Sequence, residues 1–477
     1  MGTSAAFLSM IITVPFIGLL FALTAKDDEK HLGRNAFQVS FFTVTVNLFL
    51  VWRIFTLLDL KKTGLQLVEK YHWLENPGID IVFGVDVFSM LLILGVHIAL
   101  LVGMTGVRHH QEHQKSLMVF SLLFLSMMTG YLVSADVFSF YIFFEAMLLP
   151  LFMLVGMFGE IKRQPVIFRF LIYNLMGAAL LFVALLILFD SNNVNIALNS
   201  IHKVKLSKNM EFAIWAAIFI AFLSRIPVWP FHYWISAISS NIKNPLVFIV
   251  ANIVPLTGVY GFIRFWPKTV PESVQYYMLA LEIICVISML FIALIGLINK
   301  DIQYKIFSYM TVYYIFYLLS AFVPVSTIQL NIGFSLFSYL IVVSAIVMMN
   351  SYLEIQQGLL EISPGGILCS VPRTSFVMSF LILAGVGLPL SSMFNNNFVL
   401  LAHLFGHNLR MSMVVMFSLV LVSCMLLQEL FNMKDISKVC QEKSCCEDIS
   451  VRMFGFMSAV ILVLILSLMN PLWFLGS

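Results

Sequence analysis

The chain has 477 residues, of which 61% are hydrophobic and 11% are charged, and its mean hydropathy is +0.98. Soluble domains carry about 25% charged residues, so this composition excludes a soluble enzyme and predicts an all-α polytopic membrane protein. The net charge of +3 is too small to indicate a nucleic-acid partner.

Fourteen apolar segments are long enough to cross a bilayer as helices. We expect these helices at residues 5–24, 37–60, 84–107, 116–134, 137–156, 165–189, 211–234, 245–266, 276–298, 302–322, 329–352, 374–401, 412–431 and 451–473. Residues 61–80 are a longer polar connection, predicted as a loop. The first segment follows neither a basic leader nor a cleavage site, so it predicts a retained helix and not a signal or transit peptide.

Two of the segments contain helix breakers at membrane depth. Pro227 and Pro230 interrupt the seventh segment, and Gly385, Gly387 and Pro389 interrupt the twelfth. Proline removes a backbone donor and clashes with the preceding turn, so we expect broken helices at both places. Because the breaks take corresponding positions in two five-helix units, they indicate two inverted repeats, which are typical of transporters.

The repeats suggest a division of the chain into four parts. These are an N-terminal three-helix segment (1–115), the two repeats (116–266 and 267–432), and a C-terminal loop with the last helix (433–477). An even number of helices places both termini on one side of the membrane. Lysine and arginine are more frequent in the odd-numbered links, which predicts both termini outside the matrix or cytoplasm.

Glu145 is the only acidic or basic side chain in the fifth segment. An acid at this depth costs a few kcal/mol, so such residues usually face a bundle interior or a wet cavity and mark an ion or proton path. The alternative is a neutral, hydrogen-bonded carboxylic acid that only packs two helices together.

Arg225 lies some fourteen residues into the seventh segment, directly before the proline break. A guanidinium beside unpaired backbone carbonyls is placed to hold a charge or a water chain. The alternative is an arginine that caps the first half-helix and reaches the lipid headgroups. His232 lies beside the same break. Two roles are open for it: a group that titrates near neutrality, or a neutral histidine that is hydrogen-bonded to backbone freed by the break.

Other polar residues give weaker signals. Arg108 and the neighbouring histidines, up to His113, are predicted as a solvated link and not as a metal site. His97 and Glu282 stay without a role. The cysteines match no zinc or iron–sulfur spacing, so we expect free thiols at Cys285, Cys369, Cys424, Cys440, Cys445 and Cys446.

Several motifs resemble the subunit 4 family of NADH dehydrogenase, the antiporter-like membrane subunits of respiratory complex I. The fifth segment carries FFEAMLLP at residues 143–150. The other matching motifs are FGVDVFS at 83–89, FLIYNLMG at 170–177, RIPVWPFHYW at 225–234 and GVYGFIR at 258–264. The resemblance is specific from about residue 83 to residue 264.

The resemblance implies proton translocation coupled to quinone reduction elsewhere in the complex. It implies that flavin, iron–sulfur clusters and quinone belong to partner subunits, and that this chain binds no cofactor or metal. The partners implied are other membrane-arm subunits, including neighbouring antiporter-like ones; we also expect anionic lipids such as cardiolipin and no nucleic acid. The 45 phenylalanines and the missing leader favour an organelle-encoded protein of the mitochondrial inner membrane.

The resemblance pairs Glu145 with a basic residue on the broken seventh helix, and this chain departs from the family at three positions. Arg225 stands where lysine is usual, Leu256 falls on a family lysine, and Asn397 falls on a family glutamate. Arginine holds its proton up to a pKa above about 12, so it can tune Glu145 but relays protons poorly. Lys305 and His403 are candidate replacements for the missing ionisable residues. The alternative is that the Lys305 side chain snorkels to the membrane surface and that His403 lies in an exposed loop.

The departures leave three functions open. One is a proton-translocating subunit of complex I, the second is a scaffold that holds the membrane arm together, and the third is a subunit of a multi-subunit sodium/proton antiporter. We predict that Glu145 and Arg225 approach within ion-pair or one-water distance. We also predict that hydration is continuous from Glu145 to the Pro227 break and interrupted or rerouted between Leu256 and Asn397.

Overall fold

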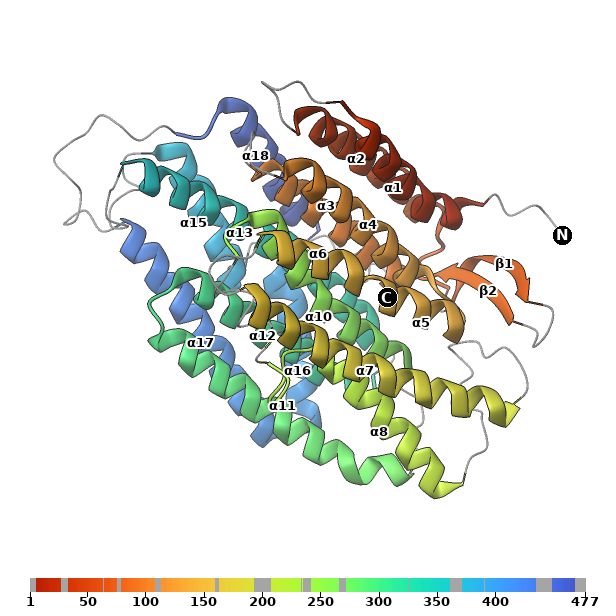
Figure 1. Ribbon diagram of the computed structural model, residues 1–477. Helices are drawn as coiled ribbons and strands as arrows, with labels where there is room; N and C mark the ends of the chain where they lie inside the picture. The colour runs from red at the N-terminus through yellow and green to blue at the C-terminus, as the bar shows by residue number, and fades with distance from the viewer. Residues whose placement is uncertain are drawn as a thin grey trace. The chain divides into compact units, whose positions relative to one another are not determined.

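The computed structural model describes residues 6–26, 33–62, 64–74, 79–107, 113–158, 163–192, 207–232, 234, 242–265, 272–325, 327–360, 371–389, 391–434 and 448–467. Helices form nearly all of these residues, and the exception is one β-hairpin (Figure 1). In chain order the elements are α1 (Phe7–Thr24), α2 (Arg34–Leu57), β1 (Gln66–Leu74), β2 (Ile79–Val85), α3 (Val87–Thr105), α4 (Gln114–Val133), α5 (Val137–Ala146), α6 (Leu148–Phe158), α7 (Arg163–Asn192), α8 (Lys208–Arg225), α10 (Pro245–Phe265), α11 (Glu272–Ile298), α12 (Ile302–Ala321), α13 (Ile328–Leu360), α15 (Pro372–Val386), α16 (Ser392–His407), α17 (Leu409–Lys434) and α18 (Val451–Leu466).

The structure is that of a multi-pass membrane protein, as the composition predicts. Each of the fourteen predicted segments contains one helix or two helical pieces. Among the described residues, 10 helices are long and apolar enough to cross a membrane, and α15 and α18 are shorter apolar helices. The number fourteen stays a prediction.

The fifth segment forms one candidate membrane span, Val137–Phe158, as the sequence predicts, but a turn divides it into two helical pieces. The segment is interrupted at Met147, between α5 and α6. Pro150 explains the position, because a proline has no N–H for the carbonyl four residues earlier and its ring clashes with that carbonyl. The carbonyl in question belongs to Ala146, the last residue of α5. Glu145 therefore lies in the last turn of a broken helix.

The prediction of a loop at residues 61–80 is wrong, because more than half of these residues belong to a β-hairpin. Strands β1 and β2 pair antiparallel, and the third helix begins at Val87 instead of residue 84. Glu69 on β1 is 4% exposed and accepts hydrogen bonds from the backbone N–H groups of Leu8 (2.7 Å) and Ser9 (3.1 Å). Since the first N–H groups of a helix have no partner within it, this carboxylate fixes the start of α1.

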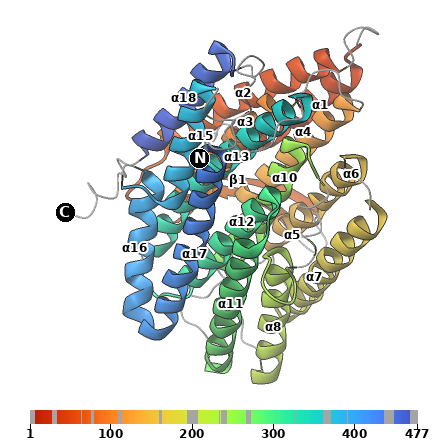
Figure 2. The same cartoon turned by 90° about the vertical axis from the view of Figure 1, so that its left-hand side faces the viewer.

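Contacts divide the chain into two compact units. Unit 1 comprises Met1–Leu101, Arg108–Ile242 and Val250–Cys285, and unit 2 comprises Val102–Val107, Lys243–Ile249 and Val286–Ser477. Within unit 1, α4 packs against α1 and α5, and α7 packs against α8 (Figure 1). Within unit 2, α12 packs against α13 and α17, and α16 lies beside α17 (Figure 2). The predicted boundaries at residues 116, 267 and 433 stay a prediction.

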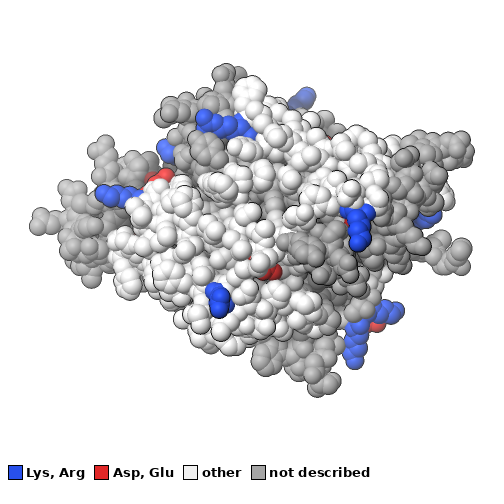
Figure 3. Space-filling model, turned by 90° about the horizontal axis from the view of Figure 1, so that it is seen from below, with Lys and Arg blue, Asp and Glu red and all other residues white. Residues whose placement is uncertain are grey.

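The described surface carries few charges. On the face drawn in Figure 3, lysines, arginines and acids are few and separated, and other residues cover most of the described surface. Large apolar side chains such as Phe21 on α1 (62% exposed) and Phe42 on α2 (70% exposed) point outward. Exposed apolar area of this kind is expected where lipid tails or other membrane subunits contact the protein.

Candidate functional site

Arg225 is the last residue of α8, directly before the helix break that Pro227 and Pro230 predict. Its side chain is 0% exposed. The Nη2 atom donates a hydrogen bond of 3.0 Å to the carbonyl oxygen of Phe144, and the guanidinium carbon lies 4.0 Å from the centre of the Phe144 ring. Phe144 lies in the last turn of α5, where helix carbonyls lack partners within the helix. Arg225 thus connects the two helix breaks of unit 1, and its burial contradicts the alternative of an arginine that reaches the headgroups.

Glu145 and Arg225 do not form a direct ion pair among the described residues. The Oε2 atom of Glu145 is buried without a hydrogen-bond partner, and so are Nε and Nη1 of Arg225. The two side chains interact electrostatically, but the guanidinium is turned to the Phe144 carbonyl that the break in α5 leaves free. The predicted approach within ion-pair or one-water distance is not met by a direct contact, and an approach through one water stays a prediction.

The surroundings of Leu256 are more polar than its side chain. Leu256 is 0% exposed on α10 and offers no hydrogen-bonding atom. Directly after it, the Thr257 carbonyl accepts a hydrogen bond of 2.6 Å from the hydroxyl of Tyr131 on α4. Tyr131 in turn interacts electrostatically with Arg225. The predicted course of hydration between Leu256 and Asn397 stays a prediction.

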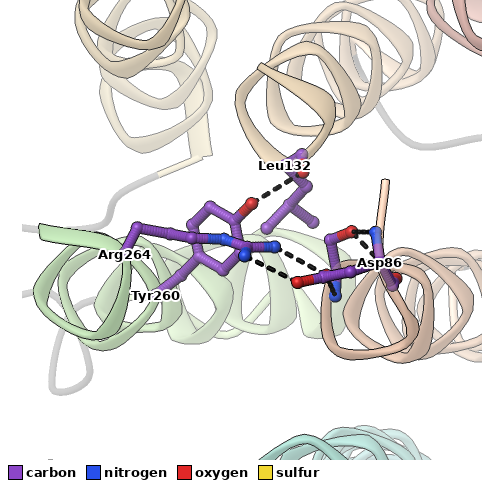
Figure 4. A network of polar contacts seen from close by, with 5 residues as sticks. Asp86, Leu132, Tyr260 and Arg264 are labelled. Carbon is purple, nitrogen blue, oxygen red and sulfur yellow. Dashed lines mark hydrogen bonds and ion pairs between the residues drawn. The ribbon is translucent and has the colours of Figure 1, made fainter. Parts of the chain in front are cut away.

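A buried ion pair to which the sequence motifs assign no role joins the residue before α3 to α10 (Figure 4). Arg264 donates two hydrogen bonds of 2.6 Å to the carboxylate of Asp86, which also accepts a hydrogen bond of 2.8 Å from the Ser89 N–H at the start of α3. Tyr260 lies beside the guanidinium and donates a hydrogen bond of 2.8 Å to the Leu132 carbonyl. The sequence does contain a signal for this pair, because Asp86 and Arg264 are the only charged residues of the motifs FGVDVFS and GVYGFIR.

Unit 2 contains a second buried ion pair. The Nζ atom of Lys305, in the first turn of α12, donates to Oε1 of Glu429 on α17. The two side chains are 5% and 13% exposed, so the alternative of a snorkelling Lys305 is wrong. Glu429 was missed from the sequence, although it is the only charged residue of the segment 412–431.

The second helix break lies between α15 and α16, as Gly385, Gly387 and Pro389 predict. Gly387 has a φ of 94°, which a glycine adopts without strain, and it ends α15 with a left-handed cap. The Gly385 carbonyl accepts hydrogen bonds from the hydroxyls of Tyr309 (3.0 Å) and Tyr313 (3.4 Å) on α12. Unit 2 therefore repeats the device of unit 1, in which a side chain of another helix donates to a carbonyl near a break.

Three of the predicted histidines differ in their surroundings. His232 is half-buried in the turns after α8, and His403 is half-buried on α16. His97 is 0% exposed, and its ring nitrogens lie 2.8 Å from the Ile93 carbonyl and 2.9 Å from the Asn47 amide. With the proton on Nδ1, both bonds are satisfied and His97 is a neutral link between α2 and α3.

The remaining polar residues hold no site that the structure describes. Glu282 is buried on α11. Cys285 and Cys424 are free thiols, as expected, whereas the other cysteines and residues 108–112 lie outside the described residues. No group of three metal-ligating side chains occurs among the described residues. Three places in the described part of the chain hold buried charges with defined partners: the Arg225 break and the Asp86–Arg264 pair in unit 1, and the Lys305–Glu429 pair in unit 2.

Interrupted apolar helices with buried charges near the interruptions are typical of membrane transport proteins. Residues 134–425, more than half of the chain, match the family described as "NADH:quinone oxidoreductase/Mrp antiporter, TM". The chain belongs to this family of membrane subunits.

Relatives from plants and bacteria match most of the chain. NADH-ubiquinone oxidoreductase chain 4 of Marchantia polymorpha is 26% identical over 414 residues, which are 84% of this chain and 81% of the relative. The corresponding protein of Arabidopsis thaliana has the same identity and coverage. NADH-quinone oxidoreductase subunit M of Rickettsia prowazekii is 24% identical over 429 residues, 87% of this chain and 85% of the relative.

Solved structures share the fold. A chain of respiratory complex I from Thermus thermophilus with bound NADH superposes with a TM-score of 0.86 at 20% identity, covering 97% of this chain and 96% of that one. A chain of the Mrp complex from Dietzia sp. DQ12-45-1b gives a TM-score of 0.79 at 14% identity, covering 97% of this chain and 50% of that one. At such identities the likeness concerns the fold.

Proposed function

We propose that this chain is a membrane-arm subunit of proton-translocating NADH:ubiquinone oxidoreductase. It contributes a proton path coupled to quinone reduction in other subunits. The observation that carries the proposal is the pair of helix breaks in unit 1, where a half-buried acid and a completely buried guanidinium both keep polar atoms without protein partners. Buried polar groups in that state normally bond to water, so water is expected to join them.

The two side chains take different roles in this path. Glu145 binds and releases the proton, since a carboxyl can exist in either form inside the membrane. Arg225 keeps its charge and acts on Glu145 electrostatically, because arginine does not give up its proton at any physiological pH. The bond from Nη2 to the Phe144 carbonyl fixes the guanidinium and leaves Nε and Nη1 for water. Proton transfer thus needs only Glu145 and water to change their hydrogen bonds.

The setting of the protein follows from the same proposal. Its partners are other membrane-arm subunits, including neighbouring antiporter-like ones, which bury part of the uncharged outer surface. Flavin, iron–sulfur clusters and quinone belong to those partners, and this chain holds no cofactor. Anionic lipids such as cardiolipin bind at the basic helix ends. The plant relatives named chain 4 and the 45 phenylalanines favour the mitochondrial inner membrane.

A scaffold without ion transport is the second candidate, and one observation favours it. Leu256 is fully buried and apolar where the family resemblance implies a lysine. A protein that had lost its proton path would keep the fold and the ion pair of Asp86 with Arg264, and it would still assemble.

Purification of the native complex tests membership. We expect the chain to co-purify with NADH-oxidising, iron–sulfur-containing polypeptides, identified by mass spectrometry and by optical and EPR spectra. Recovery of the chain as a stable homo-oligomer without such partners would contradict the proposal.

The variant Glu145→Gln distinguishes a proton path from a scaffold. Glutamine fills the same volume but cannot carry a proton, so we expect the reconstituted complex to pump fewer protons per NADH oxidised. Glu211→Gln, the same change in the first turn of α8, is the control and leaves the ratio unchanged. An unchanged ratio in both variants would favour the scaffold.

A further inference from the structure

A row of polar side chains follows one ridge of α12 through unit 2. Lys305, Tyr309, Tyr313 and Tyr317 are spaced by four residues, so neighbouring members lie one turn apart on the same side of the helix. Each of the four residues is at most 4% exposed. At about 1.5 Å rise per residue the row covers about 18 Å, more than half of a hydrocarbon core of about 30 Å.

We propose that this row is a proton route within unit 2, loaded at the Lys305–Glu429 pair and leading over the tyrosine hydroxyls to Asn397. The inference rests on the proposed function and adds a path that replaces the ionisable residue missing at Asn397. The route lies entirely in α12 and in the elements of unit 2 that pack against it.

The Lys305–Glu429 pair has the chemistry of a loading site. Lys305 lies in the first turn of α12 and Glu429 in the last two turns of α17, so the pair is near one end of both helices. Glu429 is the more exposed partner, and the Asn432 amide lies 3.4 Å from its Oε1 atom. Water at this end reaches the carboxylate first.

The charges balance in a simple cycle. Glu429 takes one proton from water and becomes neutral, which releases the Lys305 ammonium from its ion pair. Lys305 then passes one proton through bridging water to the Tyr309 hydroxyl, and the Glu429 carboxylic acid returns a proton to the Lys305 amine. The ion pair is restored, and one proton has entered the row.

The tyrosines can pass that proton on without ionising. A hydroxyl donates one hydrogen bond and accepts others, so it can release its own proton forward while it receives one from behind. The hydroxyls of Tyr309 and Tyr313 interact with each other and share the Gly385 carbonyl, and their ring centres are 4.7 Å apart. The free carbonyl at the end of α15 thus holds two consecutive hydroxyls in place.

The far end of the row meets the second helix break. The Tyr317 hydroxyl faces the side chain of Asn397 on α16, but neither that hydroxyl nor Oδ1 of Asn397 has a hydrogen-bond partner of ordinary geometry. Both atoms are buried. A water that bonds to both would satisfy them and extend the row, since buried waters typically make two to four hydrogen bonds.

Packing alone does not account for the hydroxyl of Tyr317. A buried hydroxyl without a partner costs about 1–3 kcal/mol, so phenylalanine would fill the same space with a more stable protein. Phenylalanine is abundant in this chain and already flanks the row at Phe316. The hydroxyl is therefore retained for hydrogen bonding to a mobile group.

The double variant Tyr313→Phe/Tyr317→Phe tests the row in the assembled complex. It should fold, because Tyr309 still donates to Gly385 and the Tyr317 hydroxyl has no protein partner to lose. We expect a loss in protons pumped per NADH oxidised after reconstitution into liposomes, while NADH oxidation in detergent is kept. The control Tyr314→Phe removes a buried hydroxyl of the same helix outside the row and should leave the ratio unchanged.

A second variant tests the loading pair independently of stability. Lys305→Met/Glu429→Leu replaces a buried ion pair with apolar side chains of similar volume, a change that is often neutral or stabilising. A merely structural pair would allow normal assembly and a normal proton ratio, whereas a loading site would give normal assembly and a lowered ratio.

The outcomes separate this inference from the proposed function. A lowered ratio in both double variants, with the control unchanged, supports the row. An unchanged ratio in both overturns it, even where Glu145→Gln lowers the ratio and the proposed function stands. A parent complex that oxidises NADH but pumps no protons overturns the proposed function and the row together.

Discussion

Removal of the Arg264 guanidinium is expected to destabilise unit 1 by about 3–5 kcal/mol, the usual cost of leaving a buried charge unpaired. Arg264→Met would remove both 2.6 Å hydrogen bonds to Asp86, whose side chain is only 16% exposed. The bond that Asp86 keeps from the Ser89 N–H places the effect toward the lower end of that range. Since folded proteins are stable by about 5–15 kcal/mol, much less assembled complex should be recovered.

The double variant Asp86→Asn/Arg264→Met supplies the matched comparison. Asparagine keeps the cap at the start of α3, and methionine fills the space of the arginine stem without a charge. We expect it to be much more stable than Arg264→Met, as measured by native-gel abundance and by the temperature at which the purified complex loses this chain. If the effects of the two single changes simply add in the double variant, the ion pair contributes no coupling and the reasoning is refuted.

Three further changes have defined outcomes. Gly177→Ala should lower thermal stability by about 1–3 kcal/mol, because the added methyl would collide with Ser224 beside the α8 break, whereas Gly455→Ala meets no atom within 4 Å and serves as the control. Burial raises the pKa of Asp448, but three hydrogen bonds from the start of α15 and one from the Ile449 N–H outweigh it and hold the pKa below its usual value. Its stabilisation is therefore full above about pH 3.9 and is lost as the pH falls through the lowered pKa. The protection of residues 372–378 against hydrogen exchange, taken relative to the intrinsic exchange rate at each pH, should therefore fall on acidification, and Asp448→Ala should abolish that fall. Arg225→Lys keeps the charge and a donor for the Phe144 carbonyl, so the proton ratio should be kept, and its loss would show that the planar guanidinium is required.

Sequence alone determined most of the helices and the breaks at Pro227 and Gly387, because these follow from local chemistry. Apolar length predicts a membrane helix wherever it occurs, and the segment predicted at 245–266 is α10 (Pro245–Phe265). Pro227 ends α8 at Arg225, and Gly387 ends α15, because proline lacks a donor and glycine accepts a left-handed cap. The rare charges at Glu145 and Arg225 also stood out, since few charges are tolerated in apolar segments.

Only the tertiary structure decided which charges meet. Lys305 and Glu429 are 124 residues apart and Asp86 and Arg264 are 178 residues apart, so no local pattern connects them. Glu145 and Arg225 were predicted as neighbours, yet the guanidinium bonds to the Phe144 carbonyl because the Pro150 break leaves that turn of α5 without its usual partners. Hydrogen bonds act over about 3 Å, so the choice of partner depends on how whole helices pack, and a sequence does not carry that information in any single segment.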